Sequence, residues 1–286
     1  MSTAQPRISI VTPSYNQAQY VEATVRSVFD QRYPDLEYIF MDGGSKDDTV
    51  ACLAPYRERF AHFQSAPDDG QAAAIAAGFE RATGEIMGYL NSDDVLLPGT
   101  LNFVAGYFAR HPEVDFIYGH RAIIDEHAVV RGHWILPNHS NFLMRRWDLI
   151  PQESCFWRRA LLEREGNVDP KMRFAMDYDL FVRFMRSGRF RRVNRFLAAF
   201  RIHSTSKTSS LLYTIGLQEI AQVHNTYGLR LYSTLIGKAF MVSVQARSAL
   251  FARRGSVLPG LPPSVGYNLA EVWGERSSVS TAGIGA

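Results

Sequence analysis

The chain has 286 residues, of which 46% are hydrophobic and 21% are charged, and its formal net charge is +3. This length allows one substantial core with a helical appendage. The small net charge does not favour nonspecific binding to nucleic acid, so we expect no nucleic-acid partner. Two cysteines far apart, Cys52 and Cys155, indicate neither a disulfide framework nor a zinc site.

The sequence shows no targeting or membrane-spanning pattern. Its first residues lack the charged and apolar regions of a secretory leader. No uninterrupted apolar run reaches the roughly 18 to 20 residues of a membrane span, and the nearest candidate, residues 231–251, contains Lys238, Gln245 and Arg247. We therefore expect a cytoplasmic protein.

The first hundred residues alternate strand and helix patterns. Apolar side chains recur at helical spacing over residues 21–29, and residues 71–82 are rich in alanine, so both segments are predicted to be helices. Short apolar runs predict strands at residues 7–12, 36–41, 60–65 and 86–90. Repeated βα units predict a mostly parallel sheet flanked by helices, which is an α/β fold.

Polar clusters follow three of these predicted strands, at residues 13–16, 42–45 and 91–94. Each cluster alone is compatible with a simple turn. In parallel sheets, however, ligands bind at the carboxyl ends of the strands. Three clusters at one edge therefore predict a binding site there.

The second half of the chain is less regular. A loop is expected over residues 136–150, a helix develops within 152–165, and another covers 177–187. Further strands are expected at residues 116–118, 129–135 and 197–202. The predicted organisation is an α/β domain over residues 1–208, a helical extension over 209–254 and a flexible tail over 255–286, which is rich in Gly, Pro and Ser.

Asp93 and Asp94 follow the strand expected at residues 86–90. Adjacent carboxylates repel each other, and a cation removes that repulsion. Mg²⁺ and similar hard ions bind through one or two carboxylates together with substrate phosphates. The alternative is that one of these side chains caps a helix that begins near Pro98.

Three other groups are candidates for the site. Asp177 and Asp179 lie in the first turn of a predicted helix, where the helix dipole favours carboxylates even without a catalytic role. One of them is a candidate general base. His203 follows a predicted strand, and a lone histidine is more often structural. Tyr15 and Trp157 are candidates for stacking on a base or sugar, although most aromatic residues lie in cores.

Ordered motifs along residues 7–208 resemble family 2 glycosyltransferases with the GT-A (Rossmann-like) fold. No motif is specific alone, but their order along the chain is. They are SIVTPSYN at residues 9–16, MDGGS at 41–45, DDT at 47–49, GEI at 84–86, NSDD at 91–94 followed by PG at 98–99, QESCFWRR at 152–159, MDYDLF at 176–181, RIH at 201–203 and SKT at 206–208.

The resemblance implies a role for each matching position. Asp94 would be a direct metal ligand, Asp93 would contact the metal, ribose or sugar, and His203 would approach the diphosphate or the metal. Asp177 would be the catalytic base of an inverting transfer from a nucleoside-diphosphate sugar, with Mn²⁺ or Mg²⁺ as cofactor. The donor-binding residues implied by the resemblance also include Pro13, Tyr15, Asp42, Gln71 and Asn91, with Asp42 accepting a hydrogen bond from the base.

One segment departs from the family pattern. After Gln71, the subgroup that this chain resembles carries an Asp and then an Asn-Lys pair, whereas residues 72–77 read AAAIAA. The departure leaves open a binding module that has lost turnover. A sugar nucleotidyltransferase is a further alternative, but the expected Gly-rich basic loop is absent after the first predicted strand.

The resemblance also implies partners. The acceptor would be a saccharide, a lipid-linked molecule or a protein, in polysaccharide or glycolipid assembly of the bacterial cell-envelope type. Residues 229–254 mix apolar and basic side chains without forming one clean stripe. They are expected either to pack on the catalytic domain, to form a homodimer, or to contact the inner face of the membrane peripherally.

Overall fold

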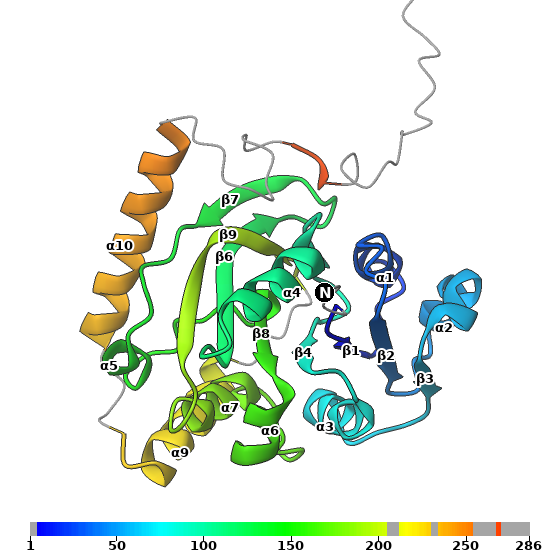
Figure 1. Ribbon diagram of the computed structural model, residues 1–286, viewed down its shortest axis with the longest axis horizontal. Coiled ribbons are helices and arrows are strands. Elements are labelled where there is room, and N and C mark those ends of the chain that lie inside the picture. The colour runs from blue at the N-terminus through cyan, green and yellow to red at the C-terminus, as the bar shows by residue number, and fades with distance from the viewer. Residues whose placement is uncertain (1–4, 205–211, 230–233, 254–266, 270–286) are drawn as a thin grey trace, which may run out of the picture.

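The computed structural model describes residues 5–204, 212–229, 234–253 and 267–269. The amino-terminal half forms four parallel strands in the order β3-β2-β1-β4, with helices packed around them (Figure 1). Its elements are β1 (Ile8–Ser14), α1 (Val21–Phe29), β2 (Leu36–Asp42), α2 (Thr49–Cys52), a 3₁₀ helix (Ala54–Arg59), β3 (His62–Ser65), α3 (Gln71–Arg81) and β4 (Ile86–Tyr89). The four predicted strands and two predicted helices of this half are confirmed.

The alanine-rich helix α3 packs closely on β1. A Cβ atom at Gly78 would lie 2.4 Å from a side-chain methyl of Val11, so only glycine allows this approach. Ala72, Ala74 and Ala76 are buried on the same helix. The alanine run thus has a structural role, because small side chains let the helix lie directly against the sheet.

The second half adds antiparallel strands to the same sheet. Strand β8 (Cys155–Arg158) lies between β4 and β6 and is antiparallel to both. Strand β9 is parallel to β6 and antiparallel to β5, and β7 forms a hairpin with β6. The other elements are β5 (Val95–Leu96), α4 (Thr100–Arg110), β6 (Phe116–Ile124), β7 (Val130–Trp134), α5 (Asn141–Met144), a 3₁₀ helix (Gln152–Ser154), α6 (Arg159–Glu165), α7 (Met176–Phe184) and β9 (Phe190–Arg201).

The strand predictions for this half need correction. Strands β5 and β8 were not predicted, and strand β9 begins at Phe190, well before the predicted start at residue 197. These strands escape a local pattern search because β5 and β8 are short and the first part of β9 carries several arginines. The helix expected to develop within residues 152–165 is confirmed as α6. The loop expected over residues 136–150 contains one short helix, α5.

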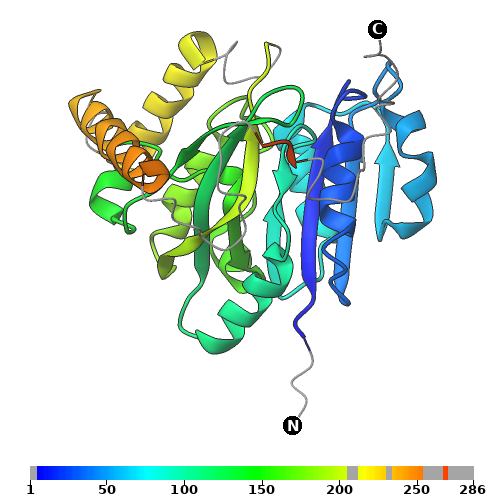
Figure 2. The same cartoon turned by 90° about the horizontal axis from the view of Figure 1, so that it is seen from above.

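The carboxyl-terminal helices share the core of the α/β domain (Figures 1 and 2). Ile220 and Val223 of α9 (Leu217–Thr226) and Phe240 and Val244 of α10 (Thr234–Arg253) belong to the same hydrophobic cluster as Trp157 of β8. A π-helical turn (Leu212–Gly216) precedes α9. None of the helices in the described residues is long and apolar enough to cross a membrane. The described part of the extension expected at residues 209–254, which includes α9 and α10, is therefore packed on the domain.

A short part of the predicted tail is also packed. Residues 267–269 pair with the β6–β7 hairpin, and Leu269 is buried in a small cluster with residues of β6, β7 and β9. The rest of the predicted tail, residues 255–266 and 270–286, lies outside the described residues.

Candidate active site

The loop after β4 meets the end of β9. Residues 91–94 connect β4 to β5, and β5 pairs with β9 through Val95 and Ala199. This pairing brings Arg201, which ends β9, and His203, which follows the strand, beside Asp93 and Asp94. Neither aspartate caps α4, because its N-cap is Gly99 in a left-handed conformation (φ 72°). The helix-cap alternative is therefore excluded.

Asp93 and Asp94 are held at several points. Asp94 is 1% exposed, its Oδ1 accepts a 2.9 Å hydrogen bond from the backbone N of Arg201, and its carbonyl accepts one of 2.7 Å from the Thr24 hydroxyl. Asp93 Oδ2 lies 3.0 Å from Nε2 of His203, and the Asp93 side chain is 22% exposed. The two carboxylates are thus fixed side by side at the sheet edge.

Buried charge at this point fits a divalent cation. Burial and the negative charges of Asp93 and Glu153 raise the pKa of Asp94 well above its ordinary value. Carboxylate oxygens are the ligands that Mg²⁺ and Mn²⁺ prefer, and such ions also use substrate phosphates as ligands. In the described residues, no three His, Cys, Asp or Glu side chains form a ready-made metal cage. Asp93 and Asp94 could supply one or two carboxylate ligands to such an ion.

The edge of β1 and β2 forms the expected nucleoside side. Asp42 is 2% exposed, and its Oδ2 accepts hydrogen bonds from the backbone N atoms of Gly44 and Ser45 and from the Ser65 hydroxyl. Its Oδ1 accepts one from the Ser45 hydroxyl. The carboxylate is fixed by its own turn, and an oxygen that accepts one bond keeps capacity for a second donor.

The other predicted donor-binding residues near this edge are arranged differently. Pro13 is buried within β1, whereas Tyr15 is 57% exposed and follows the strand. Trp157 is fully buried among core aromatic rings, so its predicted stacking on a ligand is wrong. An indole of that size fills the space between β8 and α7 and leaves no face for a substrate.

Side-chain amides connect Gln71 and Asn91. Gln71 Nε2 donates to Asn91 Oδ1 at 2.7 Å, and Asn91 Nδ2 donates to Gln152 Oε1 at 3.2 Å. Gln152 Nε2 donates in turn to the Tyr89 carbonyl at 2.7 Å. Because a carbonyl only accepts, this end sets the orientation of the three amides. Gln152 is a positioning residue that the sequence analysis did not single out.

Asp177 and Asp179 have different surroundings. Asp179 is committed to structure, since its Oδ2 lies 2.9 Å from Nη2 of Arg183 and its Oδ1 accepts from the Tyr227 hydroxyl at 2.9 Å. Asp177 accepts a hydrogen bond from the backbone N of Tyr178, and burial raises its pKa to about 6. A carboxylate with that pKa is a suitable proton acceptor near neutral pH.

A buried ion pair lies near both carboxylate groups. Arg121 of β6 donates to both oxygens of Glu153, at 2.7 Å each, and Glu153 is 2% exposed. The Arg121 charge lowers the pKa of Asp94, Asp148 and Asp177, whereas Glu153 raises them. Asp94 and Asp177 therefore share one charged neighbour, the Arg121–Glu153 pair.

These residues were missed by the sequence analysis. Arg121 interrupts the apolar strand FIYGHRAII, and Glu153 precedes the apolar run CFW. A charge within an apolar strand is a signal that buried ion pairs leave, because an unpaired charge there would be too costly. Asp148 has a buried Oδ1 with no hydrogen-bond partner, and its pKa is raised well above the ordinary value by burial and by Asp177.

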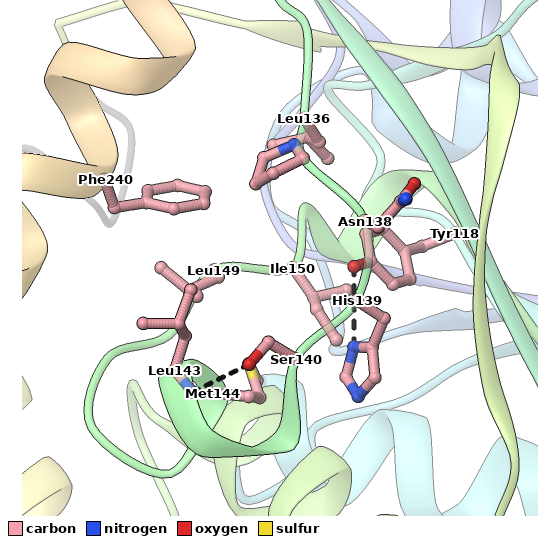
Figure 3. Close-up of a pocket in the computed structure, with 11 residues that line it drawn as sticks. Tyr118, Leu136, Asn138, His139, Ser140, Leu143, Met144, Leu149, Ile150 and Phe240 are labelled. Atoms are coloured by element: carbon pink, nitrogen blue, oxygen red, sulfur yellow. Dashed lines mark hydrogen bonds between the residues drawn. The ribbon is translucent and has the colours of Figure 1, made fainter.

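An enclosed cavity lies elsewhere, between α5 and α10 (Figure 3). Leu149, Phe240, Ser140 and Tyr118 are among its lining residues, and the Tyr118 hydroxyl lies 3.4 Å from Nδ1 of His139. Its volume of about 10 Å³ is at the limit for one water molecule. This cavity is too small for a nucleotide or a sugar.

The comparisons with known proteins agree with this geometry. A family model described as Glycosyl transferase family 2 matches residues 9–167. An uncharacterized glycosyltransferase of Mycobacterium tuberculosis is 41% identical over 187 residues, which are 63% of this chain and 70% of that protein. A chondroitin synthase of Pasteurella multocida is 26% identical over 193 residues, 66% of this chain but only 20% of its own length.

Solved structures show the same fold. TarS of S. aureus, residues 1–349 in complex with UDP-GlcNAc, has a TM-score of 0.61 and 17% identity, and the match covers 76% of this chain and 66% of that one. A mannosyltransferase of Pyrobaculum calidifontis, in complex with GDP-Man and Mn²⁺, has a TM-score of 0.60 and 18% identity, covering 90% and 78%. The fold is therefore of the GT-A type.

Proposed function

This chain belongs to glycosyl transferase family 2 and is a glycosyltransferase, and we propose that it moves a hexose from a nucleoside-diphosphate sugar to an acceptor hydroxyl with inversion. The observation that carries the proposal is that two carboxylate groups share one ion pair. Asp94, beside Asp93, and Asp177 are both close enough to Arg121–Glu153 for its charges to shift their pKa values. Asp93 and Asp94 suit the diphosphate, and Asp177 suits the acceptor hydroxyl.

The reaction follows from this arrangement. The acceptor hydroxyl transfers its proton to the Asp177 carboxylate as its oxygen attacks the anomeric carbon. The bond from that carbon to the diphosphate oxygen breaks on the opposite face, and the nucleoside diphosphate leaves with the bonding electrons. Mn²⁺ or Mg²⁺ bound by Asp94 and Asp93, with His203 nearby, would offset the charge that develops on the leaving group.

The donor side is assigned by the same reasoning. Tyr15 offers an exposed ring for a base, the fixed Asp42 carboxylate offers an acceptor, and the amides of Gln71 and Asn91 face the sugar and phosphates. The neighbours solved with UDP-GlcNAc or GDP-Man support a nucleotide-sugar donor. The chondroitin synthase match supports a saccharide acceptor in polysaccharide assembly.

The loss of polar residues after Gln71 does not require a loss of turnover. The alanines of α3 are used for packing on β1, and the Asp93, Asp94 and Asp177 carboxylates remain. For the cellular setting, we propose a cytoplasmic enzyme that acts at the inner face of the membrane. Exposed Leu235, Lys238 and Val242 of α10 support a contact there or with a second copy.

Slow hydrolysis of nucleotide sugars tests the function without knowledge of the acceptor. The protein is incubated with UDP- and GDP-sugars and Mn²⁺, and release of nucleoside diphosphate is measured. We expect release from one donor, and its loss when EDTA replaces Mn²⁺. Tight donor binding without any release, even with added saccharides, would favour a binding module. Formation of pyrophosphate from a nucleoside triphosphate and a sugar phosphate would indicate a nucleotidyltransferase.

A further inference from the structure

Arg201 contacts the Asp93–Asp94 loop through both its backbone and its side chain. It is the last residue of β9 and only 2% exposed. Its backbone N donates to Asp94 Oδ1 at 2.9 Å, and its Nε donates to the Asp93 carbonyl at 2.8 Å. The first contact orients a carboxylate, and the second fixes the position of the loop backbone.

The same guanidinium also contacts the tip of the β6–β7 hairpin. Its Nη1 donates to the carbonyls of Asp125 at 2.9 Å and Glu126 at 3.3 Å. Its Cζ lies 4.9 Å from the ring centroid of Tyr20, whose ring lies 4.8 Å from that of His203. One side chain therefore joins the loop to a hairpin that is distant from it in the sequence.

The hairpin tip is itself anchored. The Asp125 carboxylate accepts hydrogen bonds from the backbone N atoms of His127 and Val129, at 2.9 and 3.0 Å. On the outer edge, residues 267–269 add two backbone bonds, from Val130 N to the Tyr267 carbonyl and from Leu269 N to the Ala128 carbonyl. Leu269 is 1% exposed. The guanidinium thus ties the loop to a fixed support.

We propose that Arg201 is a positioning residue that holds the Asp93–Asp94 loop in the geometry needed for the cation and the donor diphosphate. This inference rests on the proposed function, because it takes Asp93 and Asp94 as the diphosphate end of the site. It adds that the β6–β7 hairpin and residues 267–269 support the site through one arginine.

The Arg201→Lys variant distinguishes a positioning role of Arg201 from a role in packing alone. An ammonium group has no planar fork, so it cannot bond the Asp93 carbonyl and both hairpin carbonyls in this geometry. The backbone hydrogen bond to Asp94 remains in such a variant. Changing groups that orient metal ligands typically lowers metal affinity about 10- to 100-fold. We expect the lower end of that range, because the Asp94 contact survives.

The experiment measures binding of UDP and of GDP by calorimetry, in Mn²⁺ and in EDTA, for the full chain. Arg201→Lys is expected to weaken binding of the preferred nucleotide about tenfold in Mn²⁺ and to leave binding in EDTA unchanged. Arg195→Lys is the matched control. Arg195 is another arginine of β9, half-buried, but it contacts the Pro98 carbonyl and the Phe103 ring, and we expect no change in either condition.

A second variant covers the case in which Arg201→Lys does not fold. Leu269→Ser loosens the hairpin support without touching the loop, and it should weaken Mn²⁺-dependent binding by a smaller factor in the same direction. Arg201→Lys binding as tightly as the parent in Mn²⁺, or weakened equally in both conditions, would overturn the positioning role alone. A parent protein whose nucleotide binding does not depend on Mn²⁺ would overturn the proposed metal site and this inference together.

Discussion

The proposed nucleotide side and the proposed acceptor side of this site are built in different ways. On the nucleotide side, Asp42 is held by Gly44 and Ser45, only two and three residues away. On the acceptor side, the N–H groups before α7 donate to Glu219, more than 40 residues away, and Arg121 pairs with Glu153 at a separation of 32. The first is organised mainly by a local turn, to which Ser65 of β3 adds one hydrogen bond, and the second by buried charges that distant elements hold together.

This difference predicts which substitutions affect binding, catalysis or stability. Changes on the nucleotide side should alter binding with little effect on folding, since the turns are local and lie at the edge of the sheet. Changes on the acceptor side should affect catalysis and stability together, because Asp177 lies near the buried Arg121–Glu153 ion pair. The following predictions separate the two sides.

We expect the largest effect from Asp177→Asn, which should lower the rate of sugar transfer. Asparagine keeps the size and most of the hydrogen bonding but cannot accept the acceptor proton, so transfer should fall roughly 10²- to 10⁴-fold. Nucleotide binding should stay within a few-fold of the parent. The control is Asp179→Asn, whose side chain is used by Arg183 and Tyr227 and should affect stability more than chemistry. Full transfer by the Asp177→Asn variant would place the base elsewhere.

The next effect is on stability. Glu153→Gln leaves the buried Arg121 without its ion-pair partner, and breaking a buried pair costs about 3–5 kcal/mol. We expect the lower end, about 3 kcal/mol, because Asp94, Asp148 and Asp177 remain near the guanidinium. Urea unfolding measures the change.

A surface pair provides the control for that measurement. Glu85 is 60% exposed and lies 2.8 Å from Nη1 of Arg158, so Glu85→Gln should cost less than about 1 kcal/mol. Equal destabilisation by the two substitutions would contradict the buried-charge description of the acceptor side.

The pH dependence of transfer follows from the raised pKa of Asp177. Its pKa of about 6 lies above the ordinary value of 3.8, so the carboxyl is protonated below that pH and cannot act as a base. The rate at limiting substrate should therefore rise with pH through about 6 and then level off. A pH–rate profile of kcat/KM measures this limb. A rate that falls as pH rises from about 5 to about 7 would exclude Asp177 as the base.

A smaller effect is expected at Glu219. This α9 carboxylate accepts three backbone N–H bonds, from Arg173, Phe174 and Ala175, at 2.7 to 2.8 Å, just before α7. Glu219→Gln removes the charge at that helix N-terminus and should lower stability by about 1 kcal/mol. Transfer should fall several-fold, because Asp177 is in the first turn of α7. Glu163→Gln, on an exposed pair with Arg159, is the control and should match the parent in thermal unfolding and transfer.

The sequence predicted those features that depend on residues close together in the chain. The βα alternation of the first hundred residues predicted the parallel strands, and the strand-end clusters predicted the edge at which Asp42, Asn91 and Asp94 lie. The proximity of Arg201 to Asp93 was not predictable, because it depends on the two-residue strand β5 and its antiparallel pairing with β9. A pairing between segments so far apart in the chain leaves no local periodic pattern.

The roles of Arg121, Glu153 and Glu219 were hidden for a related reason. Each is a single charged residue whose partner is distant in the chain, so spacing carries no information about it. The burial of α9 and α10 in the common core was likewise left open, since the apolar residues of α10 do not form one clean stripe. Short motifs made the candidate site residues predictable. The long-range contacts that support these residues were not predictable.

Calorimetric binding of the nucleoside diphosphate to the parent and to Asp94→Ala, each with Mn²⁺ and with EDTA, tests the central claim most directly. Asp94 is at a strand end and contributes little apolar burial, so the variant should remain folded, as thermal unfolding will verify. If its carboxylate holds the cation with the diphosphate, the parent should bind more tightly in Mn²⁺ by about tenfold or more, and Asp94→Ala should lose that gain. Equal, Mn²⁺-enhanced affinity in the folded variant would contradict the account.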